Sequence, residues 1–312
     1  MTPHFLQSEA WEAFQKSENF KTFRQKGKNF EFLAILRPTA LGNYLFLPYG
    51  PTLENKASLK SALKALKTLA KENNCVFIRI EPTLPFTAKE MAKYGLKKTH
   101  HIDAEHTWVL DITQSEEDIF NSIGKTKARY YRTHEKRGIT IRKSHDPADM
   151  EIFFKFYETV AEKDNFQAYD KDYLARQLKF DFATLYIAEL QQENGEKIPI
   201  AANILYKDKN TGYYPHGGAD YEHRKLLAGA ILMTEMIFDS KAAGCKKFDF
   251  WGITTSDNPK DPWYGFTQFK KSFGGYQVDY TGTYDLVINR KKYLFYSLLR
   301  PINKFKRKIF KK

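Results

Sequence analysis

Two adjacent lysines, Lys270 and Lys271, are the residues of this sequence best suited to chemistry. They end an aromatic segment, residues 263–269, and a Gly-Gly pair at 274–275 follows. An ammonium group beside aromatic rings and a tight turn is well placed to meet negative charge that develops in a partly dry site. The alternation over residues 276–280 predicts a strand, and a strand-like lysine segment would point the two side chains in opposite directions. A solvated turn with two surface lysines is the alternative.

The C-terminal segment is strongly basic. Residues 289–312 carry ten lysines and arginines and no acid, so subtracting them from the net charge of +13 leaves +3 for residues 1–288. Aromatic and aliphatic residues alternate with these cations at helical spacing. This pattern suits an anionic membrane surface, and it also suits RNA phosphates. A docked helix with a solvated basic face is the third interpretation.

A second basic segment lies near the middle of the chain. Acids at 116–118 open a predicted helix that continues to Gly138, a probable cap. Six cations fall within residues 125–137. Helical spacing predicts a shared face that binds tRNA or another phosphate, although such a face is often only solvated. The residues of this face are Lys125, Arg129, Arg132 and Lys136.

Composition narrows the class of protein. The 312 residues are 42% hydrophobic, which is enough for a substantial core. The two cysteines, Cys75 and Cys245, lie far apart without metal-ligand spacing, so we expect no disulfide framework, no metal and a reducing, cytoplasmic compartment. The N-terminus lacks the pattern of a signal peptide, and no apolar stretch has the length of a membrane span.

The elements that position these residues repeat. A strand at 44–49, a Gly-Pro turn, a helix at 59–71 and a strand at 76–81 are matched later in the chain. There, residues 213–214 and a turn at 217–218 precede a helix at 226–243 and a strand at 247–251. The order predicts a duplicated α/β unit with mixed sheets and helical crossovers.

This arrangement resembles the FemABX-type peptidoglycan aminoacyltransferases, also called non-ribosomal peptidyl transferases. The most specific part is Phe-Asp-Phe-Trp-Gly-Ile from residue 248, followed by Gly-x-x-x-Phe-Lys-Lys-x-Phe-Gly-Gly from residue 265. The other matching segments occur in the expected order over nearly the whole chain: residues 5–16, 49–51, 78–82, 125–138, 214–219 and 280–282. No heptad run is present, so the chain resembles the compact members without a coiled-coil arm.

The resemblance implies an α/β (α+β) fold of two GNAT-like subdomains, which fits the duplication. We expect the first at residues 1–143, the second at 144–288 and a basic tail at 289–312. It also implies transfer of an amino acid from aminoacyl-tRNA, a co-substrate, to the side-chain amine of a peptidoglycan precursor. The acceptor would be lipid II or UDP-MurNAc-pentapeptide, and no cofactor is implied. The tail favours lipid II and a location at the inner face of the plasma membrane.

The resemblance also assigns roles to individual residues. By motif, Lys270 stabilises the oxyanion or the leaving group, with Lys271 as the fallback. Glu81, where the family often has aspartate before proline, or Asp249 accepts the proton of the acceptor amine. Each acid also has a structural interpretation, as an edge-strand surface acid or as a loop-holding group. The candidate precursor-binding residues are Lys16, Tyr49, Tyr173, Tyr214 and Trp251.

One position departs from the family. Some members have an arginine four residues before the equivalent of Tyr173, and this chain has Tyr169, which puts a phosphate contact there in question. Two rival functions follow from the same residues. An acyl-CoA N-acyltransferase would need a glycine-rich pyrophosphate loop, but Leu227 stands where its first glycine belongs. A non-catalytic RNA- or membrane-binding protein would tolerate loss of Lys270. The oligomeric state is left open.

Overall fold

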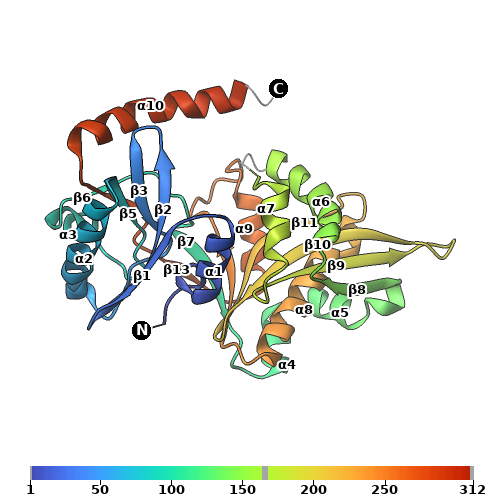
Figure 1. Ribbon diagram of the computed structural model, residues 1–312. Helices are drawn as coiled ribbons and strands as arrows, with labels where there is room; N and C mark the ends of the chain where they lie inside the picture. Colours follow the sequence, from blue (N-terminus) through green and yellow to red (C-terminus); the bar gives the residue numbers. More distant parts are fainter. Residues whose placement is uncertain (1, 164–167, 310–312) are drawn as a thin grey trace. The chain divides into compact units, whose positions relative to one another are not determined.

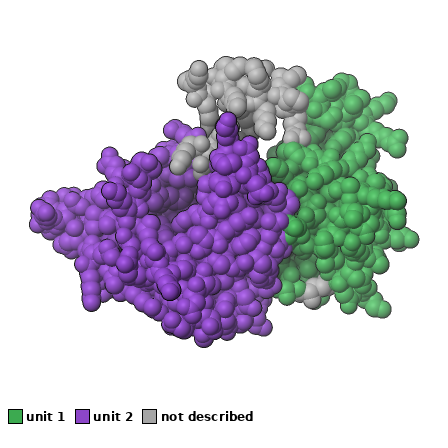
Figure 2. All heavy atoms as spheres, turned by 180° about the vertical axis from the view of Figure 1, so that it is seen from behind, with its two compact units in different colours: residues 1–105, 279–312 green, residues 106–278 purple. Residues whose placement is uncertain are grey.

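The computed structural model describes residues 2–163 and 168–309, with side chains described up to residue 299 apart from residue 163. The chain forms two compact units, residues 1–105 with 279–312, and residues 106–278 (Figure 2). These limits differ from the boundaries expected at 143 and 288. Strand pairing explains the difference, because β7 (His106–Asp111) pairs with β12 (Lys247–Gly252), whereas β14 (Tyr284–Val287) pairs with β5 (Cys75–Ile80).

The first unit contains a mixed sheet whose path is β1-β2-β3-β5-β14-β6, with β4 paired to β2 (Figure 1). Among the described strand pairs of this sheet, β3 and β5 alone are parallel, because helix α2 (Leu59–Glu72) crosses over between them. The remaining strands of the sheet are β1 (Thr22–Lys26), β2 (Phe30–Thr39), β3 (Gly42–Leu47), β4 (Thr52–Leu53) and β6 (Leu96–Lys98). The other helices of this unit are α1 (Glu9–Ser17), α3 (Ala88–Lys93) and α10 (Arg290–Ile309).

Helix α2 shows why the sequence folds in this way. Leu59, Leu63, Leu66 and Ala70 recur at helical spacing, and all four are buried in a cluster with residues of β2, β3 and β5. Lysines fill the opposite face. The apolar stripe therefore fixes the crossover against the sheet and makes the strand that follows parallel to β3.

The second unit contains a sheet in the order β13-β7-β12-β11-β10-β9-β8. Its further strands are β8 (Ile139–Ser144), β9 (Ala183–Gln191), β10 (Lys197–Lys207), β11 (Thr211–Ala219) and β13 (Tyr276–Asp279). Helices α6 (Met150–Lys163) and α7 (Lys171–Gln177) cover one face, and α8 (Ala228–Ala242) covers the other (Figure 1). Ile231, Met233 and Ile237 of α8 are fully buried.

The predicted duplication is confirmed. The elements β3–α2–β5 and β11–α8–β12 each place a helix between two parallel strands. In the second unit the parallel pairing covers only residues 211–213 and 247–249. Beyond these residues β11 and β12 are no longer paired with each other, and we call the region between their carboxyl ends the wedge.

Three local predictions were wrong. The basic helix is divided into α4 (Glu116–Ser122), α5 (Lys125–Arg132) and a 3-10 turn (Glu135–Arg137), because Gly124 has φ +83° and interrupts it. Gly217 and Gly218 lie inside β11 instead of in a turn. Close neighbours at both positions explain why these strand residues are glycines. The lysine segment is helical: it forms α9 (Tyr264–Lys271).

Candidate functional site

Lys270 lies at the wedge between β11 and β12. It belongs to the last turn of α9, where its side chain is only 7% exposed. The Nζ atom donates a hydrogen bond of 2.6 Å to the carbonyl of Gly252, the last residue of β12. The rings of Phe266 and Tyr214 face the ammonium, with Nζ 4.9 Å and 5.8 Å from their centroids. The sequence therefore buries a cation between aromatic faces, where the Gly252 carbonyl accepts a hydrogen bond from it.

Burial controls the charge of this lysine. Removal from water lowers the pKa of Lys270 to about 7, and the nearby charge of Asp249 partly offsets that effect. A lysine with a pKa in this range changes charge near neutral pH. It can act as a hydrogen-bond donor to developing negative charge while it is protonated.

Asp249 is the acidic partner of Lys270 in the second unit. It lies on β12, is 3% exposed, and accepts a 2.7 Å hydrogen bond from the backbone N–H of Trp251. Burial raises the pKa of Asp249 to about 7, although that N–H and Lys270 act to lower it. Trp251 itself has φ +67°, an unusual conformation for a bulky residue. The end of β12 is thus held in a strained turn around the carboxyl group.

Two side chains of β11 lie near the same site. Burial, followed by the charge of Lys270, lowers the pKa of His216 to about 3, so its imidazole is neutral at physiological pH. Burial raises the pKa of Tyr214, which keeps its hydroxyl protonated. The Tyr157 hydroxyl lies 3.4 Å from His216 Nδ1. The wedge therefore contains several uncharged polar groups around one titratable lysine.

Lys271 is in a different environment. Its Nζ atom lies 5.4 Å from the ring centroid of Trp108 on β7. Neighbouring residues in a helix point about 100° apart, so the two lysines diverge although the segment is not a strand. Lys270 is the one that the fold buries with Asp249 and Tyr214.

An aromatic cluster continues from His216 toward α7. Tyr169 stacks on Tyr173 with a centroid separation of 6.0 Å and meets the edge of the His216 ring at 5.2 Å. Tyr169 is 50% exposed, so its ring faces solvent. The position at which some family members have arginine thus offers a ring face to a ligand in place of a cation.

In the first unit, Glu81 is buried at the end of β5. Its Oε1 atom accepts hydrogen bonds from the Thr283 hydroxyl at 2.6 Å and from the Asp103 N–H at 3.3 Å. Burial, together with the charge of Glu81, raises the pKa of Asp103 well above its usual range. Asp103 therefore keeps a proton next to the Glu81 carboxylate. Glu81 is not the edge-strand surface acid of the alternative interpretation.

Tyr49 is also buried in the first unit. Its hydroxyl donates to the carbonyl of Ala104 at 3.1 Å, and its ring packs on His4 with 3.9 Å between centroids. The ring is 1% exposed. The backbone N–H of Glu81 donates to the carbonyl of Gly50, so Tyr49 and Glu81 belong to neighbouring segments.

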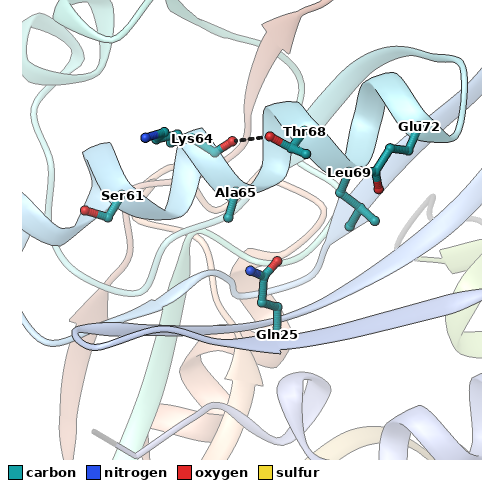
Figure 3. Close-up of a pocket in the computed structure, with 7 residues that line it drawn as sticks. All are labelled: Gln25, Ser61, Lys64, Ala65, Thr68, Leu69 and Glu72. Atoms are coloured by element: carbon teal, nitrogen blue, oxygen red, sulfur yellow. Dashed lines mark hydrogen bonds between the residues drawn. The ribbon is translucent and has the colours of Figure 1, made fainter.

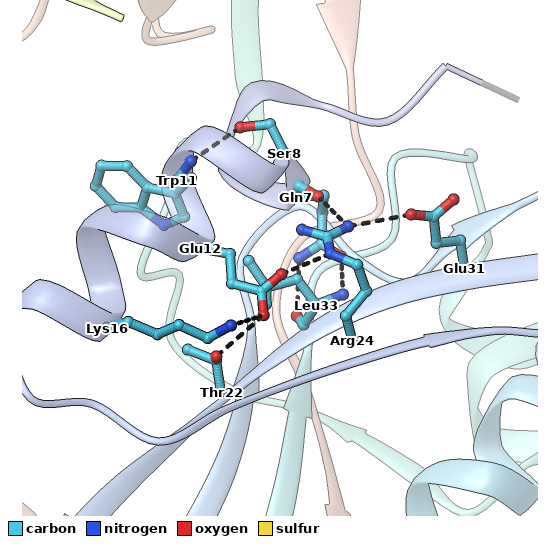
Figure 4. Close-up of polar contacts among 9 residues, drawn as sticks. All are labelled: Gln7, Ser8, Trp11, Glu12, Lys16, Thr22, Arg24, Glu31 and Leu33. Atoms are coloured by element: carbon cyan, nitrogen blue, oxygen red, sulfur yellow. Dashed lines mark hydrogen bonds and ion pairs between the residues drawn. The ribbon is translucent and has the colours of Figure 1, made fainter. Parts of the chain in front are cut away.

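Lys16 belongs to a polar network in the first unit (Figure 4). Its Nζ atom lies 2.9 Å from Glu12, which also accepts a 2.6 Å bond from Arg24. Burial acts to raise the pKa of Glu12, but hydrogen bonds from Lys16 and Arg24 hold it below its usual range. The side chain of Lys16 is 60% exposed, so its ammonium is accessible to an anionic group as well as to Glu12.

The basic face of the second unit is partly preserved. Lys125, Arg129 and Arg132 line a groove beside α4, whereas Lys136 lies in the following 3-10 turn. Arg132 pairs with Glu117 at 3.1 Å and covers the ring of Phe120. Three of the four predicted cations therefore stay together, and the fourth is separated because α5 ends at Arg132 and Lys136 lies in the 3-10 turn that follows.

A surface groove lies between β1 and α2 in the first unit (Figure 3). It is lined by Gln25 from the strand and by one face of the helix, including Lys64 and Glu72. None of its lining residues belongs to the groups described above. Within residues 2–163 and 168–309, no three His, Cys, Asp or Glu side chains gather in a way that could hold a metal ion.

Sequence reasoning missed several polar residues of these sites. Asp103 and Thr283 contact Glu81 from distant parts of the chain, and His216 and Asn203 lie on β11 and β10. The segment 214–219 was part of the resemblance, so His216 could have been identified from the sequence. Asn203 stands in an apolar run, residues 198–206, where a lone amide is the only signal.

Comparisons with known proteins bear on the family and the fold of this chain. The sequence model of the FemAB family matches residues 1–100 and 175–301. Lipid II:glycine glycyltransferase of Staphylococcus haemolyticus (strain JCSC1435) is 23% identical, over 83% of this chain and 80% of that protein. A crystal structure of FemX superimposes with TM-score 0.81 at 17% identity, covering 94% of each chain.

A tandem GNAT protein from the clavulanic acid biosynthesis pathway shares the fold, with TM-score 0.50 at 12% identity over 84% of this chain and 81% of that one. The expected fold class, an α/β protein with two GNAT-like subdomains and mixed sheets, is confirmed. Because the family match covers more than half of the sequence and includes both the Glu81 and the Lys270 segments, this chain belongs to the FemAB family.

Proposed function

We propose that this protein transfers an aminoacyl group from aminoacyl-tRNA to the side-chain amine of a peptidoglycan precursor stem peptide. The observation that carries the proposal is Lys270, a buried ammonium at the open end of a parallel strand pair. Family membership and a relative that is named for glycyl transfer involving lipid II support the reaction class. The enzyme is an acyltransferase that forms an amide at the expense of an ester.

The reaction needs no protein nucleophile. The neutral acceptor amine attacks the ester carbonyl carbon, the new C–N bond forms, and the carbonyl electron pair moves onto oxygen. The C–O bond to the tRNA ribose then breaks, and the ribose oxygen leaves with a proton. Both steps place negative charge on oxygen, which the protonated Lys270 is suited to stabilise in a water-poor setting. The chain's contribution is positioning and electrostatics.

The acceptor amine must lose a proton during the reaction. Glu81, a carboxylate with a protonated neighbour, and Asp249, a carboxyl group with a pKa of about 7, are the two candidate acceptors. We assign proton uptake to Glu81, because Asp249 is next to Lys270 and there supports the charge of the ammonium.

Binding roles follow from accessibility. Lys125, Arg129 and Arg132 would hold tRNA phosphates along their groove, with Lys136 extending the contact. Lys16 is accessible for a precursor phosphate. Tyr173, Tyr214 and Trp251 offer rings or hydroxyl groups near the wedge. Tyr49 would act indirectly, because its buried side chain orders the segment next to Glu81.

Helix α10 supports a lipid-linked acceptor. Tyr293 and Tyr296 anchor it to the first unit, through the Asp285 carboxylate and the ring of Phe77. The opposite face exposes apolar side chains, among them Leu294, Phe295 and Leu298 at 60% each. Exposed cations at residues 290–292 precede these apolar side chains, and no acid occurs from residue 289 to residue 312. An apolar face beside cations fits the surface of an anionic membrane. No helix in the described part of the chain is long and apolar enough to cross a bilayer.

Replacing Leu294, Phe295 and Leu298 together with serine should weaken binding to phosphatidylglycerol-containing vesicles by at least about tenfold, because burial of each such side chain is worth roughly 1.5–3 kcal/mol. Turnover on a soluble, nucleotide-linked acceptor should stay near the wild-type value, since the Tyr293 and Tyr296 anchors are kept. Vesicle sedimentation and steady-state turnover measure the two effects. Unchanged vesicle binding would contradict the membrane assignment, and loss of soluble turnover would show that the face is structural.

The direct test of the donor is product mass. Incubation with charged total tRNA should add an aminoacyl residue to the precursor, and prior treatment of the tRNA with ribonuclease should abolish the addition. Acetyl-CoA should give no product, since Leu227, with a bulky side chain at φ +54°, begins α8 where an acyl-CoA enzyme needs glycine. Acetylation of the precursor in place of aminoacylation would refute the proposal.

A further inference from the structure

Asn203 is an unexplained polar residue in the interior of the second unit. It lies on β10, in the middle of the sheet, and is 1% exposed. Its Nδ2 atom is buried and has no hydrogen-bond acceptor among the described residues. A buried amide donor without a partner is costly in a folded protein, so such a group needs an explanation beyond folding.

The position of Asn203 places its amide beside the wedge. Asn203 pairs in register with Gly217 of β11, beyond the point at which β11 and β12 part. A Cβ atom on Gly217 would lie 2.3 Å from Asn203 Oδ1 and 2.2 Å from the Tyr214 hydroxyl oxygen. The Asn203 side-chain carbonyl oxygen and the Tyr214 hydroxyl therefore converge over this glycine, and a side chain at residue 217 would displace them. The ring of Tyr214 in turn faces the Lys270 ammonium.

The chemistry of these groups is that of a site for an oxygen atom. Asn203 Nδ2 is a donor without an acceptor, and the protonated Tyr214 hydroxyl is a second possible donor. Amide and hydroxyl donors fixed in a buried site stabilise an oxygen on which charge develops, because they need little reorganisation during the reaction.

We propose that Asn203 is a further catalytic residue, whose side-chain amide binds the carbonyl oxygen of the aminoacyl ester together with the Tyr214 hydroxyl. The inference rests on the proposed function and makes it more specific. As the amine adds to the carbonyl carbon, the electron pair moves onto the carbonyl oxygen, and these two groups stabilise the negative oxygen by donating hydrogen bonds to it. The electron pair returns when the C–O bond to the ribose breaks. Lys270 is then available to the departing ribose oxygen.

Two substitutions test this assignment from different directions. Asn203→Leu keeps the shape of the side chain and removes its polar atoms. Gly217→Ala keeps every polar group and fills the space in which Asn203 and Tyr214 converge, at a position where the backbone conformation permits alanine. Gly229→Ala is the matched control, because a Cβ there meets only Ala219 at an ordinary 3.8 Å.

Both test variants should lower kcat for aminoacyl transfer by at least tenfold, with KM for aminoacyl-tRNA within about threefold of wild type, because the interaction strengthens as charge develops. Gly229→Ala should keep wild-type kcat. The melting temperature of Asn203→Leu should equal or exceed that of the wild type, since the substitution removes an unpaired buried amide.

Three results would overturn the assignment: wild-type kcat in Asn203→Leu, an effect confined to KM, or a marked fall in melting temperature, which would show that the amide has a structural role. Absence of transfer by the wild-type protein is a different outcome. It would refute the proposed reaction, and the melting temperature would still report whether the Asn203 amide is reserved for a ligand.

Discussion

Replacing Lys270 with alanine should lower kcat for aminoacyl transfer by about 10²–10³-fold, the usual effect of removing one preorganised donor to developing negative charge. The structure gives the reason, because the ammonium is 7% exposed, is surrounded by the rings of Phe266 and Tyr214, and is aimed at the open end of β12. A water molecule in place of the ammonium would stabilise the developing negative charge less strongly. Single-turnover transfer at saturating aminoacyl-tRNA isolates the chemical step and measures this loss.

Lys271→Ala is the matched control for that experiment. It removes an identical side chain one residue away, but this lysine faces the ring of Trp108 and is only partly buried. Turnover should therefore remain near the wild-type value. Equal losses in the two variants would mean that the segment acts as a general basic patch, and a larger loss in Lys271→Ala would reverse the assignment.

Asp249→Asn should change the pH dependence of kcat for transfer more than it changes the highest kcat reached at any pH. Transfer depends on protonated Lys270, so wild-type kcat should fall as the pH rises through about 7, the pKa of Lys270. Burial lowers that pKa and the charge of Asp249 raises it. Loss of the carboxylate therefore lowers the pKa of Lys270 further, and the decline in activity should begin at a lower pH.

The sign of this effect can be checked at both ends of the pH range. At low pH Asp249 is itself protonated, since its pKa is raised to about 7, and Lys270 is charged in both proteins. Wild type and Asp249→Asn should then have similar kcat values, and the ratio of wild-type to variant kcat should grow as the pH rises. A variant that is equally impaired at every pH would identify Asp249 as the proton acceptor for the amine, in place of Glu81.

Much of the fold could be predicted because its determinants are local. The leucines of residues 59–71 have strict helical spacing, and Gly-Cys or Asn-Cys turns precede both β5 and β12. These features identify the two strand–helix–strand units without long-range information. The basic helix was less predictable, since its charges continue across Gly124 while its backbone does not.

The lysine motif was singled out in the sequence but given the wrong local structure. Residues 264–271 show aromatic positions at 264, 266 and 269, which fit a strand as well as a helix. The backbone forms a helix whose inner face consists of Thr267 and Lys270. Burial of a threonine and a lysine runs against ordinary preference, so the side that faces inward could not be read from hydrophobicity.

The partners of the acids depend on contacts between distant segments. Thr283 meets Glu81 across 202 positions of sequence, and Asp103 lies in the loop between β6 and β7. No spacing rule connects them. The resemblance to a family pointed to Glu81 and Lys270 because those residues are part of motifs. It gave no indication of Asp103 or Asn203, whose surroundings form only in the folded chain.

The most direct test of the central claim is transfer of labelled amino acids from a charged total-tRNA pool to lipid II in anionic vesicles, with wild type and Lys270→Ala side by side. We expect label from at least one aminoacyl-tRNA to appear on lipid II with the wild-type protein. We also expect the rate to fall by about two to three orders of magnitude in the variant. Absence of label from every aminoacyl-tRNA, with an acceptor that a known transferase can use, would contradict that claim, and so would undiminished transfer by Lys270→Ala.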